Sequence, residues 1–383
     1  MHSYCTVNGP QKQAGSHGER IKMSGAARFF LARQGLGAYT VGMDIQKLVQ
    51  NLLEEGVRGG CFPAVTAAVG RGEETICLCS AGDANLDTRF DMASMSKILG
   101  PTMLALRALE EGALTLSDTI GQYFADVPQD KRDITVRHLM THTGGFTPHF
   151  LLEEEADGPA DALAAILRHP LDAAPGEKPM YSCMGYIVLG KLLEALYGAP
   201  LDALARERVF SPLGMLHTGY CPTGGNIAPT EVNPKTGAAW QGVVHDENAR
   251  FLGGVSANAG VFSDIRDCAR YASMLACGGK GYLAPATLRA AIRNYTPGHD
   301  AHRGLGFHVA GLPGEFFGDL FPAPSFGHTG FTGTSLVVDP ESGVFAVLLS
   351  NRVHPSRENA RHLRFRRRFH NAVYAALSRD ARG

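Results

Sequence analysis

The stretch SLVVDPESGVFAVLLSNR, residues 335–352, places two apolar runs on either side of a turn that contains Asp339 and Gly343. Such an arrangement is typical of a β-hairpin. Near the other end of the chain, the apolar runs 64–70 and 75–82 flank the segment RGEE and predict a second hairpin. Antiparallel strands are therefore expected at both ends of the chain.

The chain between the two hairpins carries mainly helical periodicity. The predicted helices are 94–111, 134–141, 161–168, 183–197, 201–208 and 264–277. The predicted fold class is α+β, with an antiparallel β-sheet flanked by helices and an inserted, mostly helical region.

This order of elements also predicts the domain organisation. We expect residues 43–90 and 300–383 to form a sheet lobe and residues 91–299 to form a mostly helical lobe. An active site would then lie between the lobes. Residues 1–42 are rich in Gly, Ser and Lys or Arg, and we expect them to be a disordered N-terminal extension.

The composition excludes several classes of function. Hydrophobic residues make up 44% of the 383 residues, which is enough for one large core or two moderate ones. Lys and Arg number 36 against 37 Asp and Glu, so no global field favours nucleic acid, an anionic membrane or a polyanionic substrate. The expected partner is a small molecule.

Cysteine usage and hydropathy predict the compartment. The 8 cysteines are scattered, with no CxxC pair and no metal-ligand spacing, so reduced thiols are expected. No apolar run is long enough to span a membrane, and the N-terminus lacks the apolar core of a secretion signal. We therefore expect a cytoplasmic protein.

The segment FDMASMSKILGPTMLALRALEEG contains Ser94 and Lys97 where an apolar helical pattern begins. At about 3.6 residues per turn the two side chains share one face, and free N–H groups at a helix start can hold an oxyanion. Lysine acts as a base near neutral pH only if burial lowers its pKa or a second group shares its proton. Pro101 predicts a kink or a short first segment. Taken alone, the pair is more simply explained as a chance SxxK on a solvated helix.

Two further segments add candidate site residues. In PGEKPMYSCMGY, Tyr181 precedes the helix predicted at 183–197, where a loop can present a phenol to a cleft. In FGHTGFTGTSLVV, the residues His328, Thr329 and Gly330 lie on or just before a strand whose edge can offer main-chain groups to a substrate. By themselves, a packing tyrosine and a chance three-residue match are the simpler explanations.

Together and in this order, SxxK, YSx and HTG resemble the motifs of the serine β-lactamase and penicillin-binding protein superfamily. The resemblance is strongest to its class C-like branch of esterases, D-amino-acid peptidases and related hydrolases. It covers roughly residues 44–378 and includes GCFPAVTAAVGRG, ITVRHLMTHTGGF and VHDENARFLGGVSANAGVFSD. It implies a β-lactamase/transpeptidase-like fold, and we expect no cofactor and no metal.

The resemblance also implies roles for individual residues. Ser94 would be the acylated nucleophile, and Lys97 and Tyr181 would pass its proton to the leaving group. The oxyanion hole would combine the backbone N–H groups of Ser94 and Phe331. The substrate strand would be formed by His328, Thr329, Gly330 and Phe331.

Two positions depart from the family pattern. The family usually has Asn two residues after the tyrosine, where its amide helps to hold a substrate amide and the lysine, but this chain has Cys183. Many penicillin-recognising members have Lys in place of His328, which supplies a fixed cation for a substrate carboxylate. With an ordinary pKa of about 6.5, His328 is mostly uncharged at neutral pH. Neither departure removes the nucleophile or its relay.

Other clusters carry weaker signals. The histidines His138, His142 and His149 are close in sequence but lack a zinc-ligand pattern, so a structural loop is favoured over a metal site. Asp246 and Glu247 are adjacent, and adjacent acids in an irregular segment rarely converge on one bond. We expect them to fix a loop.

The basic run RHLRFRRRFH, residues 361–370, offers two interpretations. One is an anion site, and the favoured one is a C-terminal helix packed on the sheet with a solvated Arg face. The apolar side of that helix would consist of Leu363, Phe369, Val373 and Leu377.

Two classes of function follow. The first is a serine hydrolase that forms a Ser94 acyl-enzyme from a small ester, amide, peptide or lactam, as an esterase, D-amino-acid peptidase or β-lactamase-like enzyme. The second is a catalytically weakened family member that serves as a binding or scaffold protein, for which Cys183 is the warning sign. The intact residues Ser94, Lys97 and Tyr181 favour the enzyme.

Overall fold

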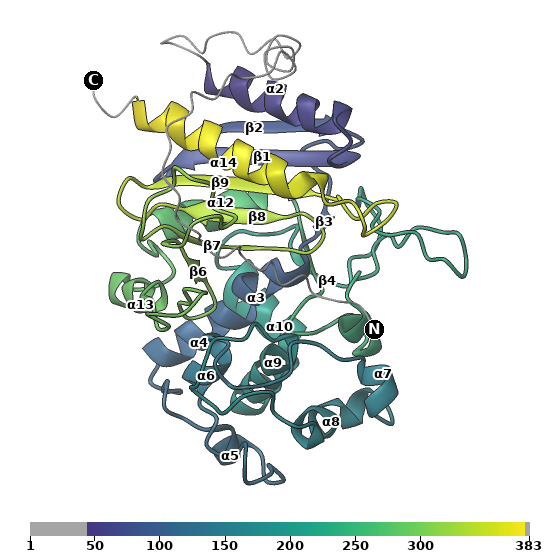
Figure 1. The fold of residues 1–383 in the computed structure, drawn as a ribbon, viewed down its shortest axis with the longest axis vertical. Helices are drawn as coiled ribbons and strands as arrows, with labels where there is room; N and C mark the ends of the chain where they lie inside the picture. The colour runs from purple at the N-terminus through teal and green to yellow at the C-terminus, as the bar shows by residue number, and fades with distance from the viewer. Residues whose placement is uncertain (1–43, 380–383) are drawn as a thin grey trace, which may run out of the picture. The chain divides into compact units, whose positions relative to one another are not determined.

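A six-stranded antiparallel sheet built from both ends of the chain organises the fold (Figure 1). The computed structural model describes residues 44–379, so the expectation for residues 1–42 lies outside the described residues. The strand order is β2-β1-β9-β8-β7-β6. The strands are β1 (Ala64–Arg71), β2 (Glu74–Gly82), β6 (His308–Val309), β7 (Phe326–Thr329), β8 (Ser335–Val338) and β9 (Val344–Ser350). Both predicted hairpins, β1–β2 and β8–β9, are confirmed.

Strand β1 joins the two ends of the chain inside this sheet. It pairs with β2 on one side and with β9 on the other, where Val65 lies opposite Ser350. The backbone N–H of Ala64 donates to Asn351 Oδ1 at 2.9 Å, which extends the same junction. All residues of β1 except Arg71 are buried, because helices cover both faces of the sheet.

Helices α2 (Ile45–Arg58) and α14 (Arg361–Arg379) cover one face of the sheet, and α12 (Ile265–Ala276) covers the other (Figure 1). The Asp44 side chain caps α2 by accepting from Gln46 N at 2.9 Å. One apolar core lies between the sheet and the pair α2 and α14. A second core joins α12 to the helical region.

Helix α9 (Cys183–Tyr197) lies at the centre of the helical region and contacts α4 (Pro101–Glu110), α6 (Val136–Met140), α8 (Ala162–Arg168) and α10 (Leu201–Ala205). Ser182 caps its start by accepting from Gly185 N at 3.1 Å. Gly198 ends it with a left-handed φ of 66°, which glycine adopts without strain. The sequence prediction of 183–197 for this helix is confirmed.

The helix expected at 94–111 is broken. A 3-10 turn (Ala93–Met95) leads into the short α3 (Ser96–Leu99), and Gly100, with φ −114° and ψ −84°, separates α3 from α4. Pro101 begins α4, because its missing N–H does no harm at a first helical position. The alternative of a short first segment is therefore confirmed.

A small three-stranded sheet holds the chain on either side of the 3-10 turn. Its order is β3-β5-β4, formed by β3 (Phe90–Asp91), β5 (Val261–Ser263) and β4 (Gly219–Tyr220). Val261 anchors the turn from both sides, because its carbonyl oxygen accepts from Met92 N at 2.9 Å and its N–H donates to Ser96 Oγ at 3.0 Å.

The remaining elements are short. They are α5 (Ile120–Tyr123), α7 (Leu152–Glu155), α11 (Glu247–Phe251), α13 (Pro285–Ala291), the 3-10 turn Pro159–Asp161 and the π-helical turn Arg206–Phe210, which replaces the end of the helix expected at 201–208. Within residues 44–379, no helix has the length and apolar character that crossing a membrane requires. The seven cysteines of this part of the chain are free.

The interpretation of α14 needs correction. Phe369, Val373 and Leu377 are buried as expected, but Leu363 is 50% exposed. Phe365 takes the expected place of Leu363 in the core. Arg366 is also buried, so the arginines of this helix do not form a purely solvated face.

Candidate active site

Ser94 lies in a tight turn whose geometry is fixed by buried polar groups. The preceding Ala93 has a left-handed φ of 46°, a conformation that costs energy for a residue with a Cβ. The buried Asp91 holds this turn, because its carboxylate accepts from Ala93 N at 2.8 Å and from His245 N at 2.6 Å. Ser94 itself is half-buried on the 3-10 turn, and not on the first turn of a long helix as expected.

The segment that follows β7 is tied to the same turn. Thr332 Oγ1 donates to the carbonyl oxygen of Asp91 at 2.7 Å, and Thr334 Oγ1 donates to that of Met92 at 3.1 Å. Within the described chain, the backbone N–H groups of Ser94 and Phe331 have no hydrogen-bond acceptor. An oxyanion hole requires two free N–H donors held close to each other. Here the two donors lie on two segments that side-chain hydrogen bonds hold together.

Lys97 is fully buried and its ammonium group has three neighbours. Its Nζ donates to Ser94 Oγ at 3.3 Å, to Cys183 Sγ at 3.6 Å and to the carbonyl oxygen of Asn258 at 2.9 Å. The same Nζ lies 4.9 Å from the centre of the Tyr181 ring. The structure therefore brings together the serine, the lysine, the tyrosine and the cysteine that the sequence singled out.

The charge of Lys97 follows from these neighbours. Burial favours the neutral amine, but the negative charge that Cys183 and Tyr181 would carry on deprotonation favours the cation, and the pKa of Lys97 lies above its ordinary value. Of the two routes that the sequence left open, the raised pKa does not favour the one in which burial alone makes Lys97 a neutral base. What remains is the second route, in which another group shares the proton.

Tyr181 lies in the loop before α9, as expected, and is half-buried with its hydroxyl oxygen inside the protein. Its ring packs against His142, with ring centres 4.4 Å apart, and its hydroxyl has no hydrogen-bond partner among the described residues. Burial raises the pKa of Tyr181, and the Lys97 cation opposes that rise. An unpartnered buried hydroxyl is available to a reacting group.

His328 is buried at the end of β7 and is uncharged. Its Nδ1 donates to the carbonyl oxygen of Thr329 at 2.8 Å. Burial and the nearby Lys97 cation lower the pKa of His328 to about 3. The expected uncharged state at neutral pH is therefore confirmed. Further along the chain, the Phe331 side chain is 49% exposed, and the centre of its ring lies 4.4 Å from the Arg352 guanidinium.

Gly330 is required by close packing. A Cβ at this position would lie 2.1 Å from Thr334 Oγ1 and 2.4 Å from the carbonyl oxygen of Met92. Only glycine lets the strand end approach the Ser94 turn this closely.

Sequence reasoning missed two neighbours of the site, Arg303 and Asn258. Arg303 is only 8% exposed, its Nη1 lies 2.5 Å from His308 Nε2, and its guanidinium lies 5.4 Å from the centre of the Tyr181 ring. Asn258 supplies the carbonyl that holds Lys97. These residues lie in irregular segments with no periodic pattern, so the only signal for Asn258 was the family-like stretch VHDENARFLGGVSANAG.

The histidines and acids considered earlier have separate structural places. His138 Nδ1 accepts from Thr135 N at 3.2 Å at the start of α6, and His142 Nδ1 accepts from Ser182 N at 3.1 Å. Asp246 caps α11 by accepting from Ala249 N at 2.8 Å, as its expected loop-fixing role requires. Across residues 44–379, no three such side chains are grouped so that they could hold a metal ion.

The fold is that of the serine β-lactamase and penicillin-binding protein superfamily. The family model described as Beta-lactamase matches residues 47–370, and the chain belongs to this family. A protein of Escherichia coli (strain K12) named D-alanyl-D-alanine carboxypeptidase is 34% identical over 308 residues, which cover 71% of this chain and 70% of that protein. A protein of Salmonella enteritidis PT4 with the same name is 32% identical over 309 residues, with 71% of each chain covered.

Solved structures share the fold. EstCE1, described as a hydrolase with promiscuous acyltransferase activity, aligns with a TM-score of 0.72 at 22% identity and covers 86% of this chain and 98% of its own. A penicillin-binding protein homologue from Caulobacter crescentus aligns with a TM-score of 0.71 at 19% identity. The alignment covers 88% of this chain and 99% of the homologue. The predicted α+β fold class and the family resemblance are both confirmed.

Proposed function

We propose that the chain hydrolyses a small ester or amide through an acyl-enzyme on Ser94. The observation that carries this proposal is the buried Lys97 ammonium, which donates to Ser94 Oγ at 3.3 Å beside the unpartnered hydroxyl of Tyr181. Membership of the Beta-lactamase family supports the same class of reaction. The catalytic group is then Ser94, Lys97 and Tyr181, with no cofactor.

In this mechanism, Ser94 Oγ attacks the carbonyl carbon of the substrate and gives its proton to the Lys97 and Tyr181 pair. The backbone N–H groups of Ser94 and Phe331 hold the oxyanion that forms. Collapse breaks the bond to the leaving alcohol or amine, which takes the proton back from Tyr181. Water then gives a proton to Tyr181 and attacks the acyl carbon, the carboxylic acid product leaves, and Ser94 Oγ takes this proton to become the hydroxyl again.

The two pKa shifts assign roles within the pair. A lysine whose pKa is raised stays protonated and acts as a fixed cation beside Oγ. In the resting pair Tyr181 is then a phenolate that the Lys97 cation stabilises, although burial opposes this state, and this phenolate takes the proton from Ser94 Oγ. The pair thus shares one proton, and its apparent pKa values belong to the pair.

Two observations bear on the substrate in opposite directions. The relatives named D-alanyl-D-alanine carboxypeptidase favour a D-amino-acid peptide that ends in a carboxylate. In this chain, however, His328 is uncharged, and the Arg303 guanidinium is buried against Tyr181 and His308. The Arg352 guanidinium beside Phe331 is buried and donates to the carbonyl oxygens of Phe331, Arg357 and Asn359. Because the lysine that many relatives have at the position of His328 is missing and these arginines are already engaged, we propose a preference for neutral esters or amides over carboxylate-bearing substrates.

The test uses the full chain and a covalent probe. A fluorophosphonate should add one adduct at Ser94, detected by intact mass, and Ser94→Ala should abolish labelling and lower ester turnover by ~10³-fold or more. A substrate panel then compares a short-chain aryl ester with a cephalosporin and a D-Ala-D-Ala peptide. Labelling or turnover that survives Ser94→Ala would refute the nucleophile. An unlabelled wild-type protein would favour the binding-protein alternative. Faster hydrolysis of a carboxylate-bearing substrate would overturn the preference for neutral ones.

The cytoplasmic location and a small-molecule partner remain predictions from the sequence. Fractionation of the producing cells would test the location.

A further inference from the structure

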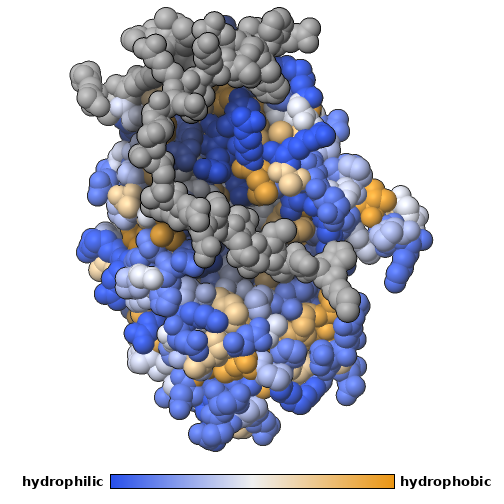
Figure 2. Space-filling model, in the orientation of Figure 1, coloured by the Kyte–Doolittle hydropathy of each residue, from blue (hydrophilic) through white to orange (hydrophobic). Residues whose placement is uncertain are grey.

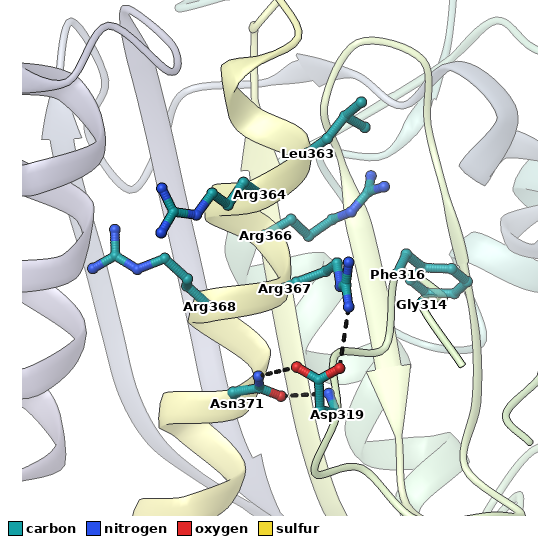
Figure 3. Close-up of a pocket in the computed structure, with 9 residues that line it drawn as sticks. All are labelled: Gly314, Phe316, Asp319, Leu363, Arg364, Arg366, Arg367, Arg368 and Asn371. Atoms are coloured by element: carbon teal, nitrogen blue, oxygen red, sulfur yellow. Dashed lines mark hydrogen bonds and ion pairs between the residues drawn. The ribbon is translucent and has the colours of Figure 1, made fainter. Parts of the chain in front are cut away.

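A polar cavity lies beside α14 and shares no residue with the catalytic group. Its volume is about 490 Å³, and its walls include Phe316, Asp319, Arg366, Arg367 and Asn371 (Figure 3). On the face seen in Figure 2, the surface is hollowed beside α14, and the visible part of the hollow is hydrophilic. A cavity of this size accommodates a small organic molecule.

Arg366 is the unusual residue of this cavity. Its side chain is only 7% exposed, yet among residues 44–379 it has neither an ion-pair partner nor a hydrogen-bond acceptor, and its Nε is buried. The guanidinium lies 5.7 Å from the centre of the Phe316 ring. Figure 3 shows it extending from α14 toward the side on which Phe316 lies. A buried cation without a counter-ion is costly unless a ligand supplies the negative charge.

Arg367 presents a second free donor on the same side of the helix. Its Nη2 donates to Asp319 at 3.1 Å, but its Nε is buried and has no partner in the described chain. Asp319 is further held by Asn371, whose Nδ2 donates to the carboxylate at 2.8 Å. Asp319 therefore neutralises Arg367 and leaves the charge of Arg366 uncompensated. Arg364 and Arg368 extend to the opposite side of the helix (Figure 3).

The other groups around Arg366 do not cancel its charge. Burial and the nearby Arg352 cation lower the pKa of Arg366 to about 10, so it remains a cation at neutral pH. Burial and the cations of Arg366 and Arg352 lower the pKa of His362 to about 3, which leaves that ring neutral. Glu315, in the loop that carries Phe316, accepts from Leu312 N at 3.2 Å and makes no ion pair with Arg366. The local field is thus positive.

We propose that this cavity binds the oxyanion group of a small molecule, a phosphate or a carboxylate, with Arg366 as its principal contact. Guanidinium groups bind both oxyanions through charge-assisted, often bidentate hydrogen bonds. The two free Nε–H donors of Arg366 and Arg367 would point to the anion, and Phe316 would line the apolar part of the ligand. Neither the family nor the proposed acyl-enzyme mechanism requires this site.

Aromatic contacts connect the wall of this cavity to the substrate strand. The Phe316 ring stands edge-on to the His308 ring, and their centres are 5.4 Å apart. The centres of the His308 and His328 rings are 4.9 Å apart. Two side chains, Phe316 and His308, thus lie between the cavity and the substrate strand.

The test is calorimetric titration of the full chain at constant ionic strength, with inorganic phosphate, pyrophosphate and succinate as separate probes. We expect saturable binding of one anion per chain, weakened about tenfold or more in Arg366→Met and less in Arg366→Lys, which keeps the charge but not the fork. The matched control is Arg361→Met, an exposed position on the same helix outside the cavity, which should bind as the wild type does. Tighter binding of phosphate than of succinate identifies a phosphate site, and the reverse identifies a carboxylate site.

Thermal melting distinguishes a loss of anion binding in Arg366→Met from a loss of folding in that variant. Arg366→Met should melt no lower than the wild type in anion-free buffer, because it removes an unpaired buried charge, and should lose the rise in Tm that the anion gives the wild type. Ser94→Ala should bind the anion unchanged, which separates this site from the acyl-enzyme. No saturable binding of any of the three anions, or an equal loss in Arg361→Met, would overturn the proposal.

Discussion

Gly330→Ala is the substitution whose effect the structure defines most directly. The added Cβ would lie 2.4 Å from the carbonyl oxygen of Met92, and ordinary contact begins at 3.4 Å, so the two segments must separate by about 1 Å. Met92 precedes the Ser94 turn, and Phe331 follows Gly330. The two N–H groups of the oxyanion hole therefore move apart. A displacement of this size beside reacting atoms costs about 10²-fold in rate, or ~2.7 kcal/mol.

The assay is kcat for an aryl ester, with fluorophosphonate labelling of Ser94 as a second readout. We expect kcat to fall about 100-fold while KM changes little, because the hole acts mainly on the transition state. Gly158→Ala is the matched control, since a Cβ there meets nothing within 4 Å and its backbone is not left-handed. If Gly330→Ala retains kcat within a fewfold of the control, the close approach of the two segments does not set the oxyanion hole.

Three further predictions follow from the site and the core. Lys97→Ala and Tyr181→Phe should each slow single-turnover acylation, and the double variant should lose far less than the product of the two losses, because the pair shares one proton; multiplying losses would contradict the relay. Cys183→Asn should raise amide hydrolysis relative to ester hydrolysis about 5- to 150-fold by restoring amide donors beside Lys97, and an unchanged or lower ratio would refute this account. His328 and His370 have a pKa of about 3, below their ordinary value, so their contribution to stability is complete above pH ~6.5 and is lost as the pH falls toward 3. Denaturant melts at pH 7 and pH 5 should differ by up to about 2 kcal/mol per histidine, and equal stabilities would contradict it.

Elements with strong local signals could be predicted from the sequence. The helix at 183–197 has a capping Ser182, a continuous apolar face and the terminating Gly198, so local chemistry and packing agree on its bounds. The C-terminal hairpin is similarly determined by its turn residues. By contrast, the break at Gly100 depends on how the Ser94 turn is held by Asp91 and Val261, and these contacts are long-range.

The candidate site divides in the same way. Ser94 and Lys97 are one turn apart, so their contact follows from helical spacing alone. Cys183 reaches Lys97 from 86 residues further along, and its place came only from the family resemblance. The sequence left two routes open for Lys97, because the ionisable neighbours that oppose the effect of burial on its pKa are brought to it only by the fold. Arg303 gave no pattern at all, since it lies in an irregular segment whose contacts form only on folding.

The pairing of β1 with β9 has a consequence for how the chain is made. The backbone N–H of Ala64 is hydrogen-bonded to Asn351, 287 residues further along the chain. Strand β1 therefore lacks its neighbour β9 until nearly the whole chain has been synthesised. At about 5–20 residues per second, that wait is roughly 15–60 s. Throughout it, the β1–β2 hairpin offers an apolar, unpaired edge to other nascent chains. Chaperone demand and yield on expression should therefore depend on this early hairpin more than on the catalytic segment.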